Sequence, residues 1–574
     1  MPFHKYYQDE LAYLRELGRD FARKYPGSAR WLEETGTDPD VERLLEGFAF
    51  LTGKLREKLD DELPELTHSL VELFWPHLLR PVPAMTILQF APTPKAQGKP
   101  IDLARGTPVE SQPLDGTACT FRTAYPTRVR PLSVAELEVG PGTGPYLRLA
   151  LTGPLAASKL GLDVLRLHLA GEPLAARSLR LCLLRYVKRV VARAPGVEAV
   201  VLEGARLEAV GLRPDEALVP AAEGSHPSLL PLWEHAAFPG KFSFVDVTGL
   251  GGLARLGAAA RFDLIFELTH LPNDMPPVSA ANVLLNCTPA VNLFPHDAAP
   301  IAIDPARAEH RVRPQGNDPH HHEVFSVDRV TGLAQGEVQP RVYAPFLSFG
   351  GRGEGPLWHG RRRMSPIHDG TDLWLSLPGR GAADMGTPET LSLELTCTNR
   401  TLPSGLGLGD VCKPTPTTPP TVTFKNITVP TASVPPPLEG ELYWDLLSHL
   451  SLHYTTRARA DRLAELLRLY DFRALVDRQA ALALKRRQEG LLEAKAAPAS
   501  RVVGGAITRG VKTSLLVDEE RLGGEGEVLL LGDVLSEVLA HTVTLNAWSE
   551  LEVRGKKFGE VHRWAPRAGT RTLV

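Results

Sequence analysis

Turn-forming residues are so dense in this sequence that they limit the length of almost every element it can build. The chain of 574 residues holds 50 glycines and 50 prolines, and both numbers exceed average usage. Between about residues 84 and 270, short apolar runs alternate with turns that contain these two residues. Such alternation is typical of antiparallel strands. We therefore expect many short strands over most of the chain rather than long helical bundles.

The first 83 residues differ, because their apolar residues recur at three- and four-residue spacing, as on one face of an amphipathic helix. The spacing predicts helices over 6–25 and 39–61 and a third that begins at Pro64. Three prolines that follow the third helix favour an extended chain over 84–90. The apolar faces consist of Tyr7, Leu11, Leu14, Leu17 and Phe21 in the first helix, and of Val41, Leu44, Leu45, Phe48, Leu51, Leu55 and Leu59 in the second.

The C-terminal part again mixes helical and strand patterns. Trp444, Leu447 and Leu450 form the apolar stripe of one expected helix. The elements expected after it are helices near 463–471, 473–496 and 531–542, and strands at 510–517, 527–530 and 543–553. Before this part, eight prolines between residues 413 and 437 favour an extended or polyproline II chain. We interpret that stretch as a surface connector that contains one strand, at 422–427.

The middle of the chain supplies most of the expected strands. The clearest lie at 162–170, 197–202, 262–270 and 323–330, with one helix at 175–190 and a turn at Thr331-Gly332. The fold class that these patterns predict is α+β, with several domains, since the chain is too long for one core. The expected parts are an N-terminal helical region (1–83), a β-rich domain (84–275), a second β-rich domain (276–412), a Pro/Thr-rich connector (413–440) and a C-terminal α+β domain (441–574).

Charge and cysteine content narrow the class of protein. Lys plus Arg is 64 and Asp plus Glu is 67, for a net charge of −3, a balance that argues against a general nucleic-acid binder. The five cysteines are far apart and show no CxxC spacing, so we expect free thiols in a reducing compartment. The sequence has no apolar signal segment and no run of about 18 apolar residues. We therefore expect a cytoplasmic protein without direct membrane insertion.

One run resembles a metal site. Asp318, His320, His321, His322 and Glu323 offer imidazole and carboxylate groups of the kind that bind zinc or nickel. Adjacent histidines point in different directions, however, and a site needs ligands from several elements. A polar loop before a strand is the better interpretation, and a metal-dependent enzyme that uses His320–His322 stays the alternative from a different class.

Other candidate chemistry is weaker still. The carboxylates of Asp60, Asp61 and Glu62 are neighbours at a helix end, where they diverge rather than share a pocket. The runs Gly249–Gly252 and Gly350–Gly355 lack the order of a phosphate-binding loop and fit turns. We expect no catalytic, cofactor-binding or metal-binding residues. The basic residues Arg361, Arg362, Arg363, Arg554, Lys556, Lys557, Arg563, Arg567 and Arg571 fit a solvated or protein-facing patch better than a nucleic-acid surface.

Several stretches carry a resemblance to a known family. They are YYQDELAYLRELGRDFARKYP, DPDVERLLEGFAFLTGKLREKLDDELPELT and PHLLRPVPAMTILQF near the N-terminus, LNCTPAVNLF and VFSVDRVTG in the middle, and ITRGVKTSLLVDEE, LGDVLSEVLAHT and RWAPRAGTR near the C-terminus. Together they resemble TssF (the VasA/ImpG family), a baseplate subunit of bacterial type VI secretion systems. The resemblance covers both ends and the block at 280–345. Between about 95 and 260 we place no family motif.

The resemblance implies a structural role without catalysis or cofactor. It implies that two copies of the chain join one TssG subunit in a wedge that binds TssK trimers and TssE. Six wedges would surround the central spike and initiate the contractile sheath, in the cytoplasm at the inner face of the inner membrane. A wedge protein of a phage tail or of another contractile injection particle is the alternative within the same class.

Assembly of this kind needs apolar surfaces that face other chains. Because the helical faces at the two ends have no obvious covering layer in the sequence, we expect them to form the interfaces. The candidate interface residues are Tyr7, Leu11, Leu14, Leu17, Phe21, Leu44, Phe48, Leu51, Trp444, Leu447 and Leu450.

Overall fold

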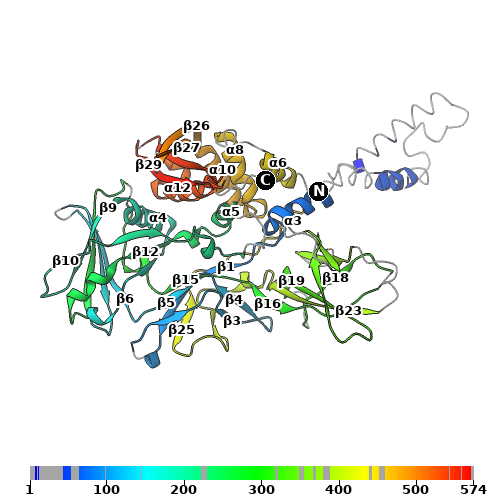
Figure 1. Cartoon of the computed structure of the whole chain (residues 1–574), viewed down its shortest axis with the longest axis horizontal. Coiled ribbons are helices and arrows are strands. Elements are labelled where there is room, and N and C mark those ends of the chain that lie inside the picture. Colours follow the sequence, from blue (N-terminus) through cyan, green and yellow to red (C-terminus); the bar gives the residue numbers. More distant parts are fainter. Residues whose placement is uncertain are drawn as a thin grey trace, which may run out of the picture. The chain divides into compact units, whose positions relative to one another are not determined.

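The computed structural model describes residues 43–52 and 64–569, together with four isolated N-terminal positions (Figure 1). The isolated positions are 7, 8, 11 and 14, and the longer range has gaps at 97, 142–143, 221–228, 274, 305, 317–320, 348–354, 366–369, 379–387, 439–441, 452–458, 504, 542 and 558. The chain divides into two compact units. The smaller comprises residues 1–71 and 437–449, and the larger comprises 72–436 and 450–574.

The smaller unit is helical where it is described. Residues 43–52 form one helical segment, and α3 (Pro64–Phe74) and α6 (Leu442–Ser451) both begin in this unit. His68 of α3 donates from Nε2 to the carbonyl oxygen of Leu438 at 3.1 Å, and its ring meets the edge of Tyr443. These contacts join segments 370 residues apart in the sequence. The helix expected to begin at Pro64 and the helix expected around Trp444 are confirmed.

One sheet of the larger unit has six strands. Its strands, in spatial order, are β24 (Val411–Pro414), β3 (Pro108–Leu114), β4 (Thr117–Thr123), β15 (Cys287–Val291), β1 (Met85–Pro92) and β25 (Val422–Asn426). The extended chain expected over 84–90 is confirmed as β1. The sheet takes strands from three of the sequence ranges expected as separate parts, and the five-part division itself stays a prediction.

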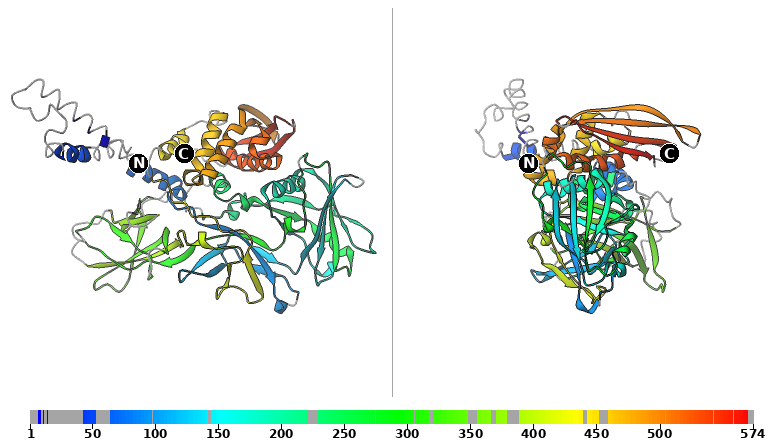
Figure 2. Two further views of the ribbon diagram at one scale, coloured as in Figure 1. Left: turned by 180° about the vertical axis from the view of Figure 1, so that it is seen from behind. Right: turned by 90° about the vertical axis from the view of Figure 1, so that its left-hand side faces the viewer.

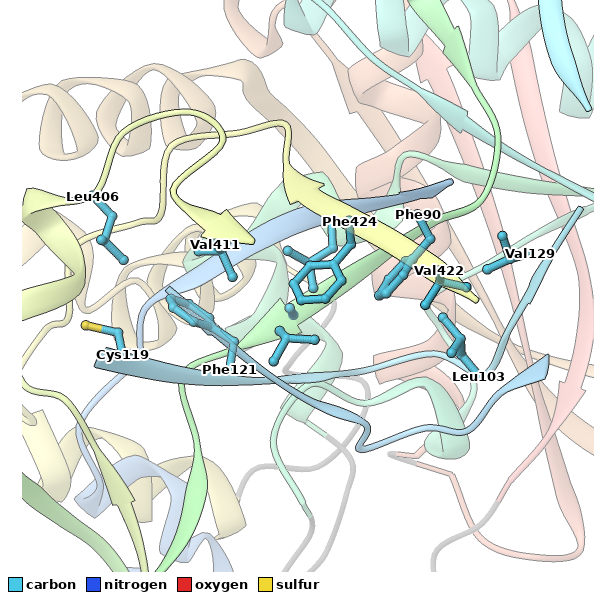
Figure 3. Packing of buried hydrophobic residues seen from close by; sticks show 12 residues of the cluster. Phe90, Leu103, Cys119, Phe121, Val129, Leu406, Val411, Val422 and Phe424 are labelled. Carbon is cyan, nitrogen blue, oxygen red and sulfur yellow. The ribbon is translucent and has the colours of Figure 1, made fainter. Parts of the chain in front are cut away.

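One apolar cluster covers this sheet. Figure 3 shows Phe90 and Phe424 facing each other, with ring centroids 5.4 Å apart, and Phe121, Val411 and Val422 close by. All five side chains are buried. Because β1 and β25 are far apart in the sequence, this core forms only after long-range pairing of Phe90 with Phe424 in the antiparallel register.

The Pro/Thr-rich stretch 413–437 contributes the end of β24 and the whole of β25 to this sheet. The strand expected at 422–427 is confirmed as β25, which pairs with β1 along its length. Val434 forms a bridge with Val82, and the Thr415 hydroxyl donates to the carbonyl oxygen of Pro108 at 3.0 Å. In these two strands, sheet pairing satisfies backbone groups that a polyproline helix would leave to water. The interpretation of the whole stretch as a connector stays a prediction.

Two further sheets are formed by residues between 133 and 284. The first has the order β10 (Val200–Val201), β9 (Val187–Arg193), β13 (Arg261–Leu268), β7 (Tyr146–Thr152) and β6 (Ser133–Gly140), and the second has the order β11 (Arg206–Ala209), β12 (Phe244–Thr248), β8 (Leu165–Leu169) and β14 (Val283–Leu284). A separate two-stranded sheet joins β2 (Ile101–Leu103) and β5 (Thr127–Val129). The strands expected near 165, 200 and 265 are confirmed, the second as two residues only.

The helix expected over 175–190 ends earlier than its spacing suggested. α4 (Pro173–Leu181) continues into one π-helical turn, η5 (Cys182–Tyr186), and the chain then enters β9. β9 pairs with β13 on one side and β10 on the other. The last four residues of the expected helix are therefore strand, because pairing on both sides outweighs a helical period in so short a run.

Strands between residues 294 and 398 form an eight-stranded sheet. Its strands are β16 (Phe294–Asp297), β23 (Glu389–Thr398), β19 (Glu323–Ala334), β20 (Arg341–Pro345), β21 (Leu357–Met364), β22 (Thr371–Ser376) and β18 (His310–Val312), with β17 (Ile301–Ala302) beside β23. The expected turn at Thr331-Gly332 is wrong, because β19 continues to Ala334. Gly332 serves close packing instead: a Cβ there would lie 2.2 Å from Oε1 of Glu389.

The C-terminal part places one buried helix against a four-stranded sheet. The helices are α8 (Ala460–Tyr470), α9 (Arg473–Val476), α10 (Arg478–Gly490), α11 (Glu519–Leu522) and α12 (Glu525–Ala540), and the sheet order is β26 (Leu491–Val503), β27 (Ala506–Val517), β28 (Ala547–Gly555) and β29 (Val561–Ala568). β27 and β28 are parallel, and α12 lies in the connection between them. Figure 2 shows the long β26–β27 hairpin in orange.

Two expectations for this part are wrong. Residues 527–530 belong to α12 rather than to a strand, because a short, fully buried apolar run has no period that separates strand from helix. Residues 491–496 belong to β26 rather than to the preceding helix, which ends at Gly490. β26 pairs with β27 along its length, and this pairing overrides the helix propensity of its alanines and leucines. The α+β, multi-domain class is confirmed.

The expectation of unpaired cysteines is confirmed. Cys119, Cys182, Cys287 and Cys397 are buried and Cys412 is partly exposed, and none forms a disulfide. Burial raises the pKa of the Cys119 thiol to about 11 and that of Cys182 to about 12, so both are protonated at neutral pH. Among the helices of the described residues, none combines the length and the apolar character needed to cross a membrane.

A candidate protein–protein interface

The helical segment 43–52 carries an apolar stripe on its outer surface. Leu44, Phe48 and Leu51 are 74%, 56% and 62% exposed. Their spacing of four and then three residues places them on one face of the helix. A Cβ added to Gly47, beside this face, would meet no atom within 4 Å. We name these three residues the exposed stripe.

One flank of the same segment is covered. Ala49 is fully buried and Leu45 is half-buried. Glu46 is exposed and lies away from the exposed stripe by the helical period. The segment is therefore held on one side and presents leucine and phenylalanine to solvent on another. Covering each such side chain stabilises a complex by about 1.5–3 kcal/mol, which gives the exposed stripe the chemistry of a docking surface.

The other N-terminal candidates are only partly within the described residues. Tyr7, Leu11 and Leu14 are helical and half-buried, while Leu17 and Phe21 lie outside the described residues. The spacing of the first three fits the helix expected over 6–25. Half-burial leaves part of each side chain available to another surface.

In α6 the buried face is displaced from the expected stripe. Tyr443 and Leu446 are buried, whereas Trp444 and Leu447 are half-buried. Leu450 lies in the helix, but its side chain is outside the description. The sequence missed Tyr443 and Leu446 because several apolar residues in this helix satisfy three-residue spacing. The edge contact between Tyr443 and His68 selects the face that turns inward.

Two further exposed apolar groups lie in the C-terminal part, and the sequence analysis did not single them out. Leu475, Val476 and Leu482 of α9 and α10 are each more than half exposed. Val502 and Ile507 are 70% and 74% exposed and pair across the end of the β26–β27 hairpin. The sequence could have indicated these groups, because they are apolar residues in helices or at a hairpin end, where the element itself cannot bury them.

The His-rich run does not converge on one point in its described part. The Nδ1 atom of His321 lies 2.7 Å from the hydroxyl of Thr117, while His322 stacks on His296 with ring centroids 4.8 Å apart. Glu323 is buried and accepts from the backbone and hydroxyl of Thr371. Asp318 and His320 lie outside the described residues. The described side chains therefore serve three different contacts.

The basic runs are used inside the chain. Arg362 donates to the carbonyl oxygens of Val324 and Phe325, at 2.7 and 2.9 Å. In the C-terminal run, ion pairs join Lys557 to Glu520, Arg563 to Glu552 and Arg567 to Glu537. Acidic partners from α11, α12 and β28 thus balance a run that only Glu560 opposes within its own span of the sequence.

Of three other sequence candidates, two lie mostly outside the described residues and one forms a turn. Asp60, Asp61, Glu62 and positions 350–354 lie outside the described residues. Gly249 adopts a φ of +72° ahead of the 3-10 helix η9 (Leu250–Leu256), and a Cβ there would lie 2.1 Å from the Gly204 carbonyl oxygen. Gly249 is therefore required by a turn and a close approach of two backbones.

Comparison with known proteins identifies the family. The family model described as "Type VI secretion system, TssF" matches residues 2–571. This chain belongs to the TssF family. A relative, the type VI secretion system component TssF1 of Pseudomonas aeruginosa, is 32% identical over an alignment of 624 positions that covers 99% of this chain and 98% of the relative.

Two solved structures resemble this TssF-family chain. A chain in a cryo-electron microscopy structure of a type VI secretion system TssK-TssF-TssG baseplate subcomplex matches with a TM-score of 0.77 and 28% identity, over 92% of this chain and 99% of that one. A chain in a structure of the type VI secretion baseplate complex matches with a TM-score of 0.61 and 25% identity, over the whole of both chains. The resemblance suggested by the sequence is thereby confirmed, and it extends through the region at 95–260 where no motif was placed.

Proposed function

We propose that this chain is a structural subunit of a type VI secretion baseplate wedge and joins TssG- and TssK-type subunits through its N-terminal helices. The observation that carries the proposal is the exposed stripe, which leaves three large apolar side chains in solvent on a helix that is covered along one flank at Leu45 and Ala49. Its support from relatives is the match to a chain of a TssK-TssF-TssG baseplate subcomplex.

The proposed interface comprises more than the exposed stripe. We include the half-buried Tyr7, Leu11 and Leu14, because they continue a helical apolar face in the same unit. Leu17 and Phe21 are included by their spacing alone. Trp444, Leu447 and Leu450 of α6 are included as a second helical surface, with Trp444 and Leu447 half-buried.

The finer arrangement also belongs to the proposal. Two copies of the chain would associate with one TssG-type subunit, and the wedge would contact TssE, the central spike and the sheath. The site of assembly would be the cytoplasm, at the inner face of the inner membrane. The role is structural and without catalysis: the described residues singled out for chemistry, such as His321, His322 and Glu323, have internal partners that suit a scaffold.

A co-purification experiment tests the proposal. The chain is co-expressed with the TssG- and TssK-type subunits of the same organism, with the affinity tag on the TssG-type subunit. We expect a ternary complex in size-exclusion chromatography and two copies of this chain per TssG-type subunit in native mass spectrometry. The control omits the TssG-type subunit. Elution of this chain apart from its co-expressed partners would contradict the proposal, and a ratio of one would contradict only the stoichiometry.

A further inference from the structure

Three potential metal ligands meet at the start of α12. Glu525 is the first residue of that helix, and Glu560 and His562 lie at the start of β29. One potential ligand atom from each residue lies within 4.8 Å of the other two. Among the described residues, this is the group in which three such side chains come together. The elements that bring them together are the helix α12 and the β28–β29 hairpin of the C-terminal part.

His562 is aimed into this cluster. Its Nε2 atom lies 3.2 Å from Oε1 of Glu525, and the side chains are only 7% and 10% exposed. The same nitrogen forms no hydrogen bond of good geometry despite its burial. Buried nitrogen atoms in folded proteins nearly always have a hydrogen-bond partner, whereas this one makes an ion-pair contact with Glu525 that does not meet hydrogen-bond geometry, an arrangement that a cation between the two groups would explain.

The carboxylate oxygens that face the Tyr186 hydroxyl also have fewer hydrogen-bond donors than they could accept. Its hydroxyl lies 2.8 Å from Oε2 of Glu560 and also contacts Oε1 of Glu525. A phenol carries one hydrogen and donates to one acceptor at a time. When both carboxyls are ionised, one carboxylate oxygen faces the phenol without a hydrogen between them, beside a second carboxylate. A cation among these oxygens would remove both the repulsion and the deficit of donors.

We propose that Glu525, Glu560 and His562 bind one divalent transition-metal ion, for which zinc is the best match. One imidazole nitrogen and two carboxylate oxygens are ligands that zinc accepts, with a water molecule in the fourth position. Magnesium and calcium prefer sites made of oxygen alone. Glu560 is 36% exposed, which leaves a path for the ion and its water.

Neighbouring groups are placed to orient the ligands. Nε2 of His270 lies 3.0 Å from Oε1 of Glu560, and its ring packs on Tyr186 with centroids 3.9 Å apart. Outer groups of this kind fix the direction of metal ligands and strengthen binding. Since Tyr186 ends η5 and His270 follows β13, the ion would tie α12 and β29 to the five-stranded sheet that contains β9 and β13.

The test measures zinc and cobalt binding by the full chain. The chain is stripped with a chelator and exchanged into zinc-containing buffer, and bound metal is counted by mass spectrometry after gel filtration. We expect one zinc ion per chain and a higher Tm with zinc than without. Cobalt should give the visible absorption of a tetrahedral site. Glu560→Gln and His562→Ala should abolish this uptake at equimolar metal, and Tyr186→Phe should weaken it about tenfold.

Glu552→Gln is the matched control, because Glu552 is a largely buried acid on the neighbouring strand β28 with Lys512 and Arg563 as partners. It should bind zinc as the unmodified chain does. The proposal is overturned if the unmodified chain takes up no more zinc than Glu560→Gln, or if Glu552→Gln loses as much. Should His562→Ala fail to fold, Glu560→Gln decides the outcome alone, because Glu560 is partly exposed and the substitution preserves its shape.

Discussion

The helical segment 43–52 and α12 start from similar sequence and end in opposite environments. Both are helical and rich in leucine. In α12 the apolar side chains are buried around the whole circumference, including Val528, Leu531, Val534 and Leu535. In the segment 43–52, Leu44, Phe48 and Leu51 are more than half exposed.

The difference lies in what the chain itself supplies as cover. α12 packs on β28, β29, α4 and α5 (Leu230–Ala237), all of which belong to the same unit. Even its acids have partners: Asp533 pairs with Arg180 at 2.6 Å and accepts from the Trp564 indole at 2.6 Å. An apolar helical face thus predicts that a partner exists. It does not say whether the partner is the same chain or another one.

The largest expected effect comes from a charge placed inside α12. Val534 is fully buried. Val534→Asp should destabilise the larger unit by on the order of 5 kcal/mol or more, because the carboxylate would have no partner in the core. Urea unfolding followed by circular dichroism measures this. A variant that unfolds at nearly the same urea concentration would mean that α12 is not the internally covered helix described above.

A smaller loss is expected from breaking the buried ion pair. Arg180 is fully buried, so Arg180→Met leaves Asp533 without its cation and should cost about 3–5 kcal/mol. The double variant Arg180→Met/Asp533→Leu should cost less than the sum of the two single variants. The comparison uses urea midpoints of all four proteins. Strict additivity would show that the pair does not couple α4 to α12.

Acid should destabilise the packing of α12 against α5, which carries His235. The exposed stripe contains no side chain that titrates. Burial lowers the pKa of His235, and the charges of Arg487 and Arg177 lower it further, although Glu527 opposes them. The unfolded chain therefore binds a proton near the ordinary pKa of about 6.5 while the folded chain resists it. Stability is full above that pH and falls below it, by up to about 1.4 kcal/mol per pH unit.

His235→Gln should reduce this acid sensitivity, measured as the change in Tm between pH 7 and pH 5. Glu527 acts in the same direction at lower pH. Burial raises the pKa of its carboxyl, but His235 and the charge of Arg177 outweigh burial and hold that pKa well below its usual range. Equal acid slopes for His235→Gln and the unmodified chain would contradict the assignment of this proton to His235.

The sequence predicted elements well where local spacing decides them. α3, α8 and β1 follow from apolar period, from a proline at a helix start and from prolines that extend the chain. Pairing between distant segments was not predictable. β1 pairs with β25, whose residues lie more than 300 positions later, and no local pattern encodes that choice.

The candidate interface shows the same limit. The helical spacing predicted that Leu44, Phe48 and Leu51 share one face, but their exposure is known only from the structure. In α6 the period allowed more than one face, and the buried residues are Tyr443 and Leu446. The cluster of Glu525, Glu560 and His562 had no sequence signal, because 35 positions separate its first two members and a hairpin brings them together.

The exposed stripe is tested most directly by Phe48→Asp, with Glu46→Lys as the matched control on the opposite side of the same helix. Both substitutions change charge at exposed positions, so each should alter the free energy of unfolding by no more than about 0.5 kcal/mol. The measurement is complex formation with co-expressed TssG- and TssK-type subunits, alongside Tm. We expect Glu46→Lys to assemble normally and Phe48→Asp to stay folded but fail to assemble. Normal assembly of Phe48→Asp, or a fall in its Tm like that of Val534→Asp, would contradict the account.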